Sequence, residues 1–173
     1  MIARRALIAA AALALAAPAA ARDSGQWTTV SAVDLARAFR AICLDHPGDA
    51  EAQAAIGQAD PWNLTQQEEV DSNGRTGYRT GKLQLGVTVK GDTRVCALTT
   101  GFPLGGDGLA ALAARVSPVL RSGDYKLLDD MRAAWSVDTP YGKQEARLSV
   151  KDAPEIGMKV STLIIVIENV KAI

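Results

Sequence analysis

The 173-residue chain is poor in the residues on which many binding and catalytic sites depend. It has one His, two Cys and an aromatic content of 5%. A single His excludes a metal site built from histidines alone, and a serine triad would have to use His46. Neither charge is in excess, with 19 Lys and Arg against 19 Asp and Glu. Because neutralising phosphates requires a basic surface, we expect no nucleic-acid partner.

The chain also lacks an apolar run of transmembrane length. Its longest apolar run is residues 6–17, which is 12 residues and too short to cross a bilayer. Arg4 and Arg5 precede the run, Pro18 ends it, and three alanines (19–21) match a small-residue cleavage site. The pattern predicts a signal peptide over 1–21, cleaved near Ala21. The alternative is an uncleaved anchor helix.

The predicted mature chain, 22–173, has the length of a single globular domain with its own core. Loss of Arg4 and Arg5 leaves 17 basic against 19 acidic residues, a net charge of −2. We expect a domain without a membrane span, located in the periplasm or secreted from the cell.

Three helices are predicted from caps and apolar spacing. Ser31 and Asp34 have the spacing of a capping box and predict a helix start, and Pro47-Gly48 ends that segment. Asp49 is the expected cap of a second helix over 50–56, closed by Gly57.

The third helix is expected to begin at Asp107, which we interpret as its cap. Apolar residues then recur at helical spacing between Leu109 and Leu120. Pro118 is expected to shorten or kink the last turns.

Strands are predicted where apolar and polar residues alternate. The clearest case is 83–89, followed by a tight turn at Gly91-Asp92 and a return strand over 94–100. The polar stretch 58–77 is interpreted as a long loop with at most a short strand at 68–70.

The last third of the chain is interpreted as strands. The candidates are 125–128, 133–137, 144–150 and 159–170. Within the last, 163–167 is apolar on both faces, which is typical of a sheet covered on both sides or of a homodimer interface. The resulting fold class is α+β, a mainly antiparallel sheet with about three helices in the order helix, helix, strands, helix, strands. That order hints at two similar halves.

Cys43 and Cys96 are predicted to form one disulfide bond, because the predicted destination is oxidising. The bond would close a loop of 54 residues between the first helix and the strand hairpin. The alternative is two free, buried thiols. Cys43 and His46, three residues apart, could then form a nucleophile pair or part of a metal site. We favour His46 as a cation near a helix C-terminus, and we expect neither a metal nor a cofactor.

The remaining candidate site residues are aromatic or acidic. Contacts to a partner are predicted for aromatic residues in expected loops and turns, namely Trp62, Tyr78, Phe102 and Tyr141, although each could instead pack on the core. A pair of carboxylates could serve as acid and base if two of Glu68, Asp129 and Asp130 converge in a cleft.

Two segments carry a resemblance to a known group of proteins. They are Phe39-Arg-Ala-Ile-Cys-Leu-Asp-His-Pro-Gly-Asp-Ala-Glu-Ala and Arg94-Val-Cys-Ala, which follow the predicted signal peptide. This arrangement resembles small secreted or periplasmic proteins of alphaproteobacteria that have one Cys in a helix and one in a strand. The resemblance implies an exported, disulfide-bonded domain and carries over no catalytic residue.

The absence of a coherent catalytic set favours a non-catalytic exported domain that binds a protein, a peptide or a component of the cell envelope. The alternative is a small periplasmic hydrolase or lyase that uses the carboxylates named above.

Overall fold

The computed structural model describes residues 29–70, 74–122, 124–168 and 170. The predicted signal peptide and its cleavage site lie outside these ranges. The helical elements are α1 (Ala32–Phe39), the π-helical turn η1 (Arg40–Leu44), α2 (Ala50–Gln58), α3 (Leu109–Leu120) and the 3₁₀ turn η2 (Pro154–Ile156). No helix in the described ranges is both long enough and apolar enough to cross a membrane.

Eight strands form one sheet in which every neighbouring pair is antiparallel. They are β1 (Thr65–Val70), β2 (Arg75–Arg79), β3 (Gln84–Lys90), β4 (Thr93–Pro103), β5 (Lys126–Asp129), β6 (Arg132–Thr139), β7 (Gly142–Ala153) and β8 (Met158–Ile167). The order across the sheet is β1-β2-β3-β4-β8-β7-β6-β5. The predicted α+β class is therefore confirmed.

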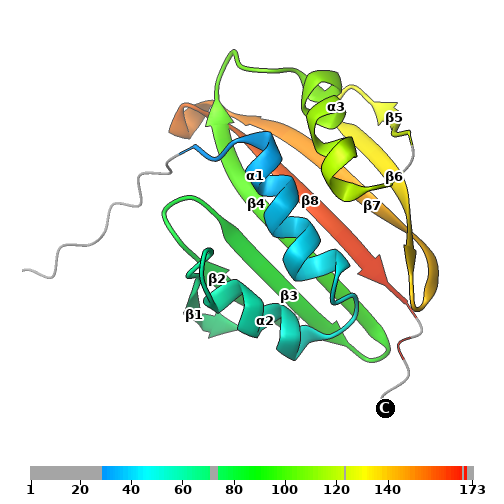
Figure 1. Ribbon diagram of the computed structural model, residues 1–173. Coiled ribbons are helices and arrows are strands. Elements are labelled where there is room, and N and C mark those ends of the chain that lie inside the picture. The colour runs from blue at the N-terminus through cyan, green and yellow to red at the C-terminus, as the bar shows by residue number, and fades with distance from the viewer. Residues whose placement is uncertain (1–28, 71–73, 123, 169, 171–173) are drawn as a thin grey trace, which may run out of the picture.

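The strand order divides the fold into two topologically similar halves. Each half consists of a helical segment followed by four consecutive strands, and the halves meet where β4 pairs with β8. The helices α1, α2 and α3 all lie on one face of the sheet (Figure 1). We call the opposite face of the sheet the open face.

A local departure from α-helical geometry follows α1. Ser31 caps the helix as predicted, since its hydroxyl accepts a hydrogen bond from the Asp34 N–H at 3.1 Å. Downstream, the Asp45 N–H reaches back five residues to the Arg40 carbonyl at 2.9 Å. Within this wider turn, Ile42 and Cys43 are both fully buried, at 0% exposure.

The predicted disulfide bond is present between Cys43 and Cys96, with a Cα–Cα distance of 5.6 Å. It joins the π-helical turn η1 to the central strand β4. Because η1 directly continues α1, the bond attaches the first helix to the middle of the sheet.

The expected long loop over 58–77 is wrong, because this stretch contains the hairpin of β1 and β2. The edge strand β1 has one neighbour, so its side chains can be polar on both faces and show no alternation. The second helix ends at Gln58, one residue beyond the expected Gly57. Gly57 lies close to β3, since a β-carbon there would be 2.9 Å from Leu85 Cδ2.

The third helix begins differently from the prediction. Gly108 occupies the N-cap position, and Asp107 forms an ion pair with Arg115 at 2.9 Å instead of capping the helix. The helix continues past Pro118 to Leu120. Pro118 has no N–H to donate to the carbonyl of Ala114, which is therefore left without a helical partner. Both residues are exposed, so water can hydrate that carbonyl.

The apolar run on β8 is covered by helices on one face only. Leu163, Ile165 and Ile167 point into the core, where they are almost completely buried. Ile164 and Val166 point to the open face, and Val166 is 37% exposed. No helix of the described residues covers that face (Figure 1), so the predicted homodimer through 163–167 stays a prediction.

Candidate functional site

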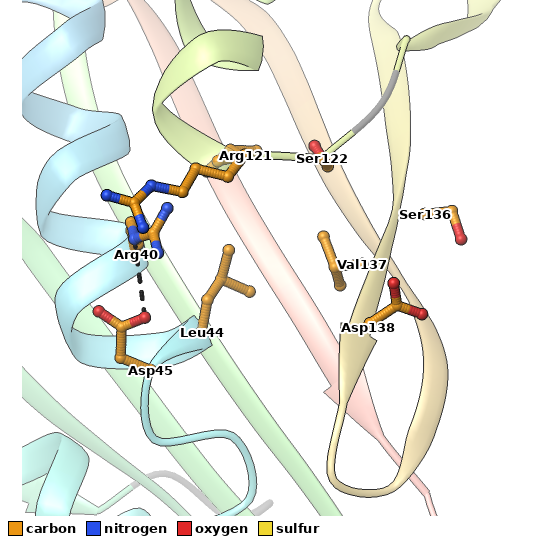
Figure 2. A pocket seen from close by; sticks show the side chains of 9 residues that line it. Arg40, Leu44, Asp45, Arg121, Ser122, Ser136, Val137 and Asp138 are labelled. Atoms are coloured by element: carbon orange, nitrogen blue, oxygen red, sulfur yellow. Dashed lines mark ion pairs between the residues drawn. The ribbon is translucent and has the colours of Figure 1, made fainter.

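A hollow of about 260 Å³ opens on the helical side of the sheet, between the end of α1, the end of α3 and strand β6 (Figure 2). Its lining is more polar than the core around it. The lining residues are Arg40, Leu44, Asp45, Leu120, Arg121, Ser122, Ser136, Val137 and Asp138. We call this hollow the arginine pocket.

Arg40 is held in place by neighbours on two elements. Its Nη1 donates a hydrogen bond to the Val119 carbonyl of α3 at 3.2 Å, and its Nε lies 3.6 Å from Asp45 Oδ1. The side chain is 26% exposed. The π-helical turn puts Asp45 next to Arg40, because the Asp45 N–H bonds to the Arg40 carbonyl. The Arg40 guanidinium is therefore fixed at the wall of the pocket.

Arg121 supplies a second cation to the same wall. It follows α3 in the left-handed conformation, at φ 50°, and its side chain extends across to the Arg40 guanidinium (Figure 2). No hydrogen bond or ion pair joins the Arg121 side chain to another residue of the described ranges. Two neighbouring guanidinium groups repel each other, and an anion between them would remove this repulsion.

The rest of the pocket is apolar, with Leu44 and Val137 beside the two arginines (Figure 2). Asp138 on β6 also lines the pocket, but its pairing with Lys143 turns its side chain toward the open face. Ser122 Oγ is buried beside the pocket and has no hydrogen-bond partner among the described residues. The arrangement suits a ligand with an anionic group at the arginines and an apolar portion over Leu44 and Val137.

The described part of the chain offers no site for thiol or metal chemistry. Cys43 is bonded to Cys96, so it has no thiol for the Cys43/His46 pair considered above. His46 is exposed in the turn after η1, and its carbonyl accepts a hydrogen bond from Gln53 Nε2 at 2.9 Å. No group of three or more metal-ligating side chains occurs among the described residues.

The acidic candidates with described side chains, Asp129 and Asp130, are exposed where β5 ends and turns into β6. Asp129 accepts hydrogen bonds from Arg132 Nε at 2.7 Å and from the Met131 N–H at 2.9 Å. The bond from Arg132, followed by that from Met131, holds the pKa of Asp129 below its ordinary value. Asp130 is exposed in the turn between β5 and β6. Glu68 belongs to β1, and its side chain lies outside the description.

The aromatic candidates are dispersed over the molecule. Tyr78 is on β2 instead of in a loop and packs in the core, where it is 7% exposed. Trp62 and Phe102 are half-buried and line two hollows that share residues 29–31, the segment leading into α1. Tyr141, also half-buried, packs at the β6–β7 turn against Gly48.

Sequence reasoning therefore missed the arginine pocket. Arg40 was recognisable only as a residue away from the apolar stripe of the first helix, and Arg121 as a residue after the third. Their proximity depends on the packing of α1 against α3 across the sheet, which no local pattern reports.

Comparison with known proteins gives no relative from which to infer a function. No protein-family model, no curated protein and no solved structure matches the chain. The resemblance to secreted alphaproteobacterial proteins therefore stays a prediction.

Proposed function

We propose that this protein is an exported, non-catalytic binding domain, and that the arginine pocket recognises an anionic group of a protein, a peptide or an envelope component. The observation that carries the proposal is the position of the Arg121 guanidinium beside that of Arg40 (Figure 2). Arginine forks bind carboxylates and phosphates with paired, charge-assisted hydrogen bonds.

The burial of Arg40 supports a binding role. Its side chain is 26% exposed, so a bound anion would be only partly screened by water. The hollow, about 260 Å³, is large enough for one functional group with a short apolar portion. A larger molecule would therefore be held by one of its ends or side chains.

The disulfide bond supports the exported location, because such bonds persist in oxidising compartments. The signal peptide at 1–21 is part of the same proposal. Its direct test is the intact mass of the exported protein, with and without reductant and alkylating agent. We expect a chain that starts after Ala21 and has two thiols that react only after reduction.

The alternative, a carboxylate-dependent hydrolase or lyase, gains no support from the geometry. A general acid at neutral pH needs a raised pKa, whereas Arg132 lowers the pKa of Asp129. Asp129 is also bonded on both carboxylate oxygens, which leaves less capacity to accept a substrate proton.

The binding proposal is tested by following backbone amide signals in NMR while inorganic phosphate or glutarate is added. In the wild type we expect saturable shifts of the amide signals around Arg40, Arg121 and Asp138. These shifts should be absent in Arg121→Gln. Arg115→Gln is the matched control, because Arg115 lies on α3, the helix that Arg121 follows, but outside the arginine pocket. Equal titration of the wild type and Arg121→Gln would contradict the proposal.

A further inference from the structure

We propose that the arginine pocket takes a carboxylate that stands beside a small aliphatic group, as at the C-terminus of a polypeptide that ends in Ala or Val. The inference rests on the proposed function and narrows it from an anionic group to one chemical class. Three properties of the lining carry it: the donors that the two arginines offer, the net charge of the lining, and the apolar side chains beside the arginines.

The two arginines offer donors for an anion with two oxygens. Arg40 uses Nη1 for the Val119 carbonyl, and its Nε faces Asp45, whereas its Nη2 has no partner among the described residues. Arg121 has no side-chain partner in that part of the chain, so it can present two parallel N–H groups. One fork and one further donor match a carboxylate, whose two oxygens can accept all three bonds.

The charge of the lining favours a monovalent anion. Arg40 and Arg121 bring two positive charges, and Asp45 brings one negative charge, with Oδ1 3.6 Å from Arg40 Nε. Asp138 also lines the pocket, but its side chain turns toward the open face. A single negative charge therefore neutralises the pocket. A dianion such as sulfate would bring a second negative charge near Asp45, and the two would repel each other.

Apolar side chains continue the pocket from the arginines. Leu44 and Val137 lie beside the two guanidinium groups (Figure 2), and Leu120 completes this part of the lining. Val137 is 6% exposed and Leu120 is 5% exposed, so the apolar surface that they offer is small. A methyl or isopropyl group can cover this surface, whereas a longer chain would extend into water and gain nothing further.

The size of the hollow favours the end of a molecule over its middle. About 260 Å³ holds a carboxylate and a small aliphatic group. A phosphodiester has a substituent on each side of its phosphate, and a Glu side chain has an unbranched linker instead of a separate aliphatic group. The last residue of a polypeptide carries its carboxylate and its side chain on one carbon. The two groups can therefore reach the arginines and Leu44 together while the rest of the polypeptide leaves through the opening.

The test follows backbone amide signals of the disulfide-bonded protein while three dipeptides are added. They are N-acetyl-Ala-Val with a free C-terminus, the same dipeptide as its C-terminal amide, and the C-terminal amide of N-acetyl-Ala-Glu, whose carboxylate is on the side chain. We expect the free acid to bind at least about tenfold more tightly than either amide. Isobutyrate should bind about fivefold more tightly than acetate, because it adds the aliphatic group.

Two variants test the charge and the apolar part of the lining. Asp45→Asn leaves Arg40 bonded to the Val119 carbonyl, and it should raise the affinity for sulfate about tenfold relative to that for the free acid. Asp34→Asn is the matched control, because Asp34 lies on α1 outside the arginine pocket, and it should change neither affinity. Leu44→Ala, with an otherwise unchanged amide spectrum, should bind isobutyrate only as tightly as acetate.

Three results would overturn this inference and leave the proposed function standing. The first is binding of sulfate to the wild type as tightly as the free acid. The second is equal binding of the side-chain carboxylate, which would assign the pocket to acidic side chains. The third is tighter binding of isobutyrate than of the dipeptide acid, which would assign it to a free small carboxylate. Binding of the Val amide as tightly as the acid, or of no anion at all, would overturn both proposals.

Discussion

The indole Nε1 of Trp135 on β6 donates a hydrogen bond to Ser117 Oγ on α3 at 2.6 Å. Trp135 is among the largest fully buried side chains of the protein, so its polar atom needs a partner inside the fold. This bond connects the third helix to the second half of the sheet.

Replacement of Ser117 by Ala should lower the free energy of unfolding by about 1–3 kcal/mol, because the buried indole N–H loses its acceptor. Urea denaturation followed by far-UV circular dichroism measures the change. Ser149→Ala on the open face is the control and should change the free energy of unfolding by less than about 0.5 kcal/mol. A Ser117→Ala variant as stable as wild type would show that another acceptor replaces the hydroxyl.

Removal of the disulfide bond should reduce stability by about 4 kcal/mol at most, because the Cys43–Cys96 bond closes a long loop in the unfolded chain. The test compares denaturation of wild type, with and without reductant, and of the Cys43→Ala, Cys96→Ala variant. Reductant should destabilise the wild type and leave the double variant unchanged. If reductant has no effect on the wild type, the bond does not form in the isolated protein.

Gly57→Ala should destabilise the protein by about 1–3 kcal/mol through overpacking, although Ala is the better helix former. The added β-carbon would be 2.9 Å from Leu85 Cδ2 and 3.2 Å from Leu64 Cδ1, and both leucines are buried. A double-mutant cycle with Leu85→Val measures the coupling, since Val lacks the δ-carbon. The substitution at Gly57 should cost less in the Leu85→Val background, and equal costs would refute this explanation.

The Asp129–Arg132 pair should stabilise the fold, and this stabilisation should be lost at acid pH. Because Arg132 lowers the pKa of Asp129 in the folded state, the contribution is present above the unfolded pKa of about 3.9. It is lost as the pH falls through the lower pKa of the folded state. Carboxyl ¹³C NMR should show the Asp129 signal titrating with a midpoint below that value, and Arg132→Gln should raise this midpoint. An unchanged titration in Arg132→Gln would assign the shift to the Met131 N–H instead.

Local signals in the sequence were sufficient for most of the elements. Ser31 and Asp49 were recognised as helix caps because a cap bonds the backbone two or three residues away, and both bonds are observed. The alternation over 83–89 identified β3 because it has one buried face. The Cys pair was assigned from residue type and predicted compartment, and the structure contains that bond.

Elements whose form depends on distant neighbours were missed. Thr65–Val70 forms an edge strand whose polar side chains carry no periodic signal, so its hairpin was interpreted as a loop. Gly57 was interpreted as a helix end, whereas Leu85, from another part of the chain, explains the close approach. Asp107 was interpreted as a cap, whereas it pairs with Arg115.

Composition, helix caps and strand alternation are properties of neighbouring residues, and the amino-acid sequence therefore determined them. The meeting of Arg40 with Arg121 arises from long-range packing. A balanced net charge carries no information about which charged side chains meet, because strand register and helix placement decide which side chains point outward together. The arginine pocket is therefore a product of the tertiary structure.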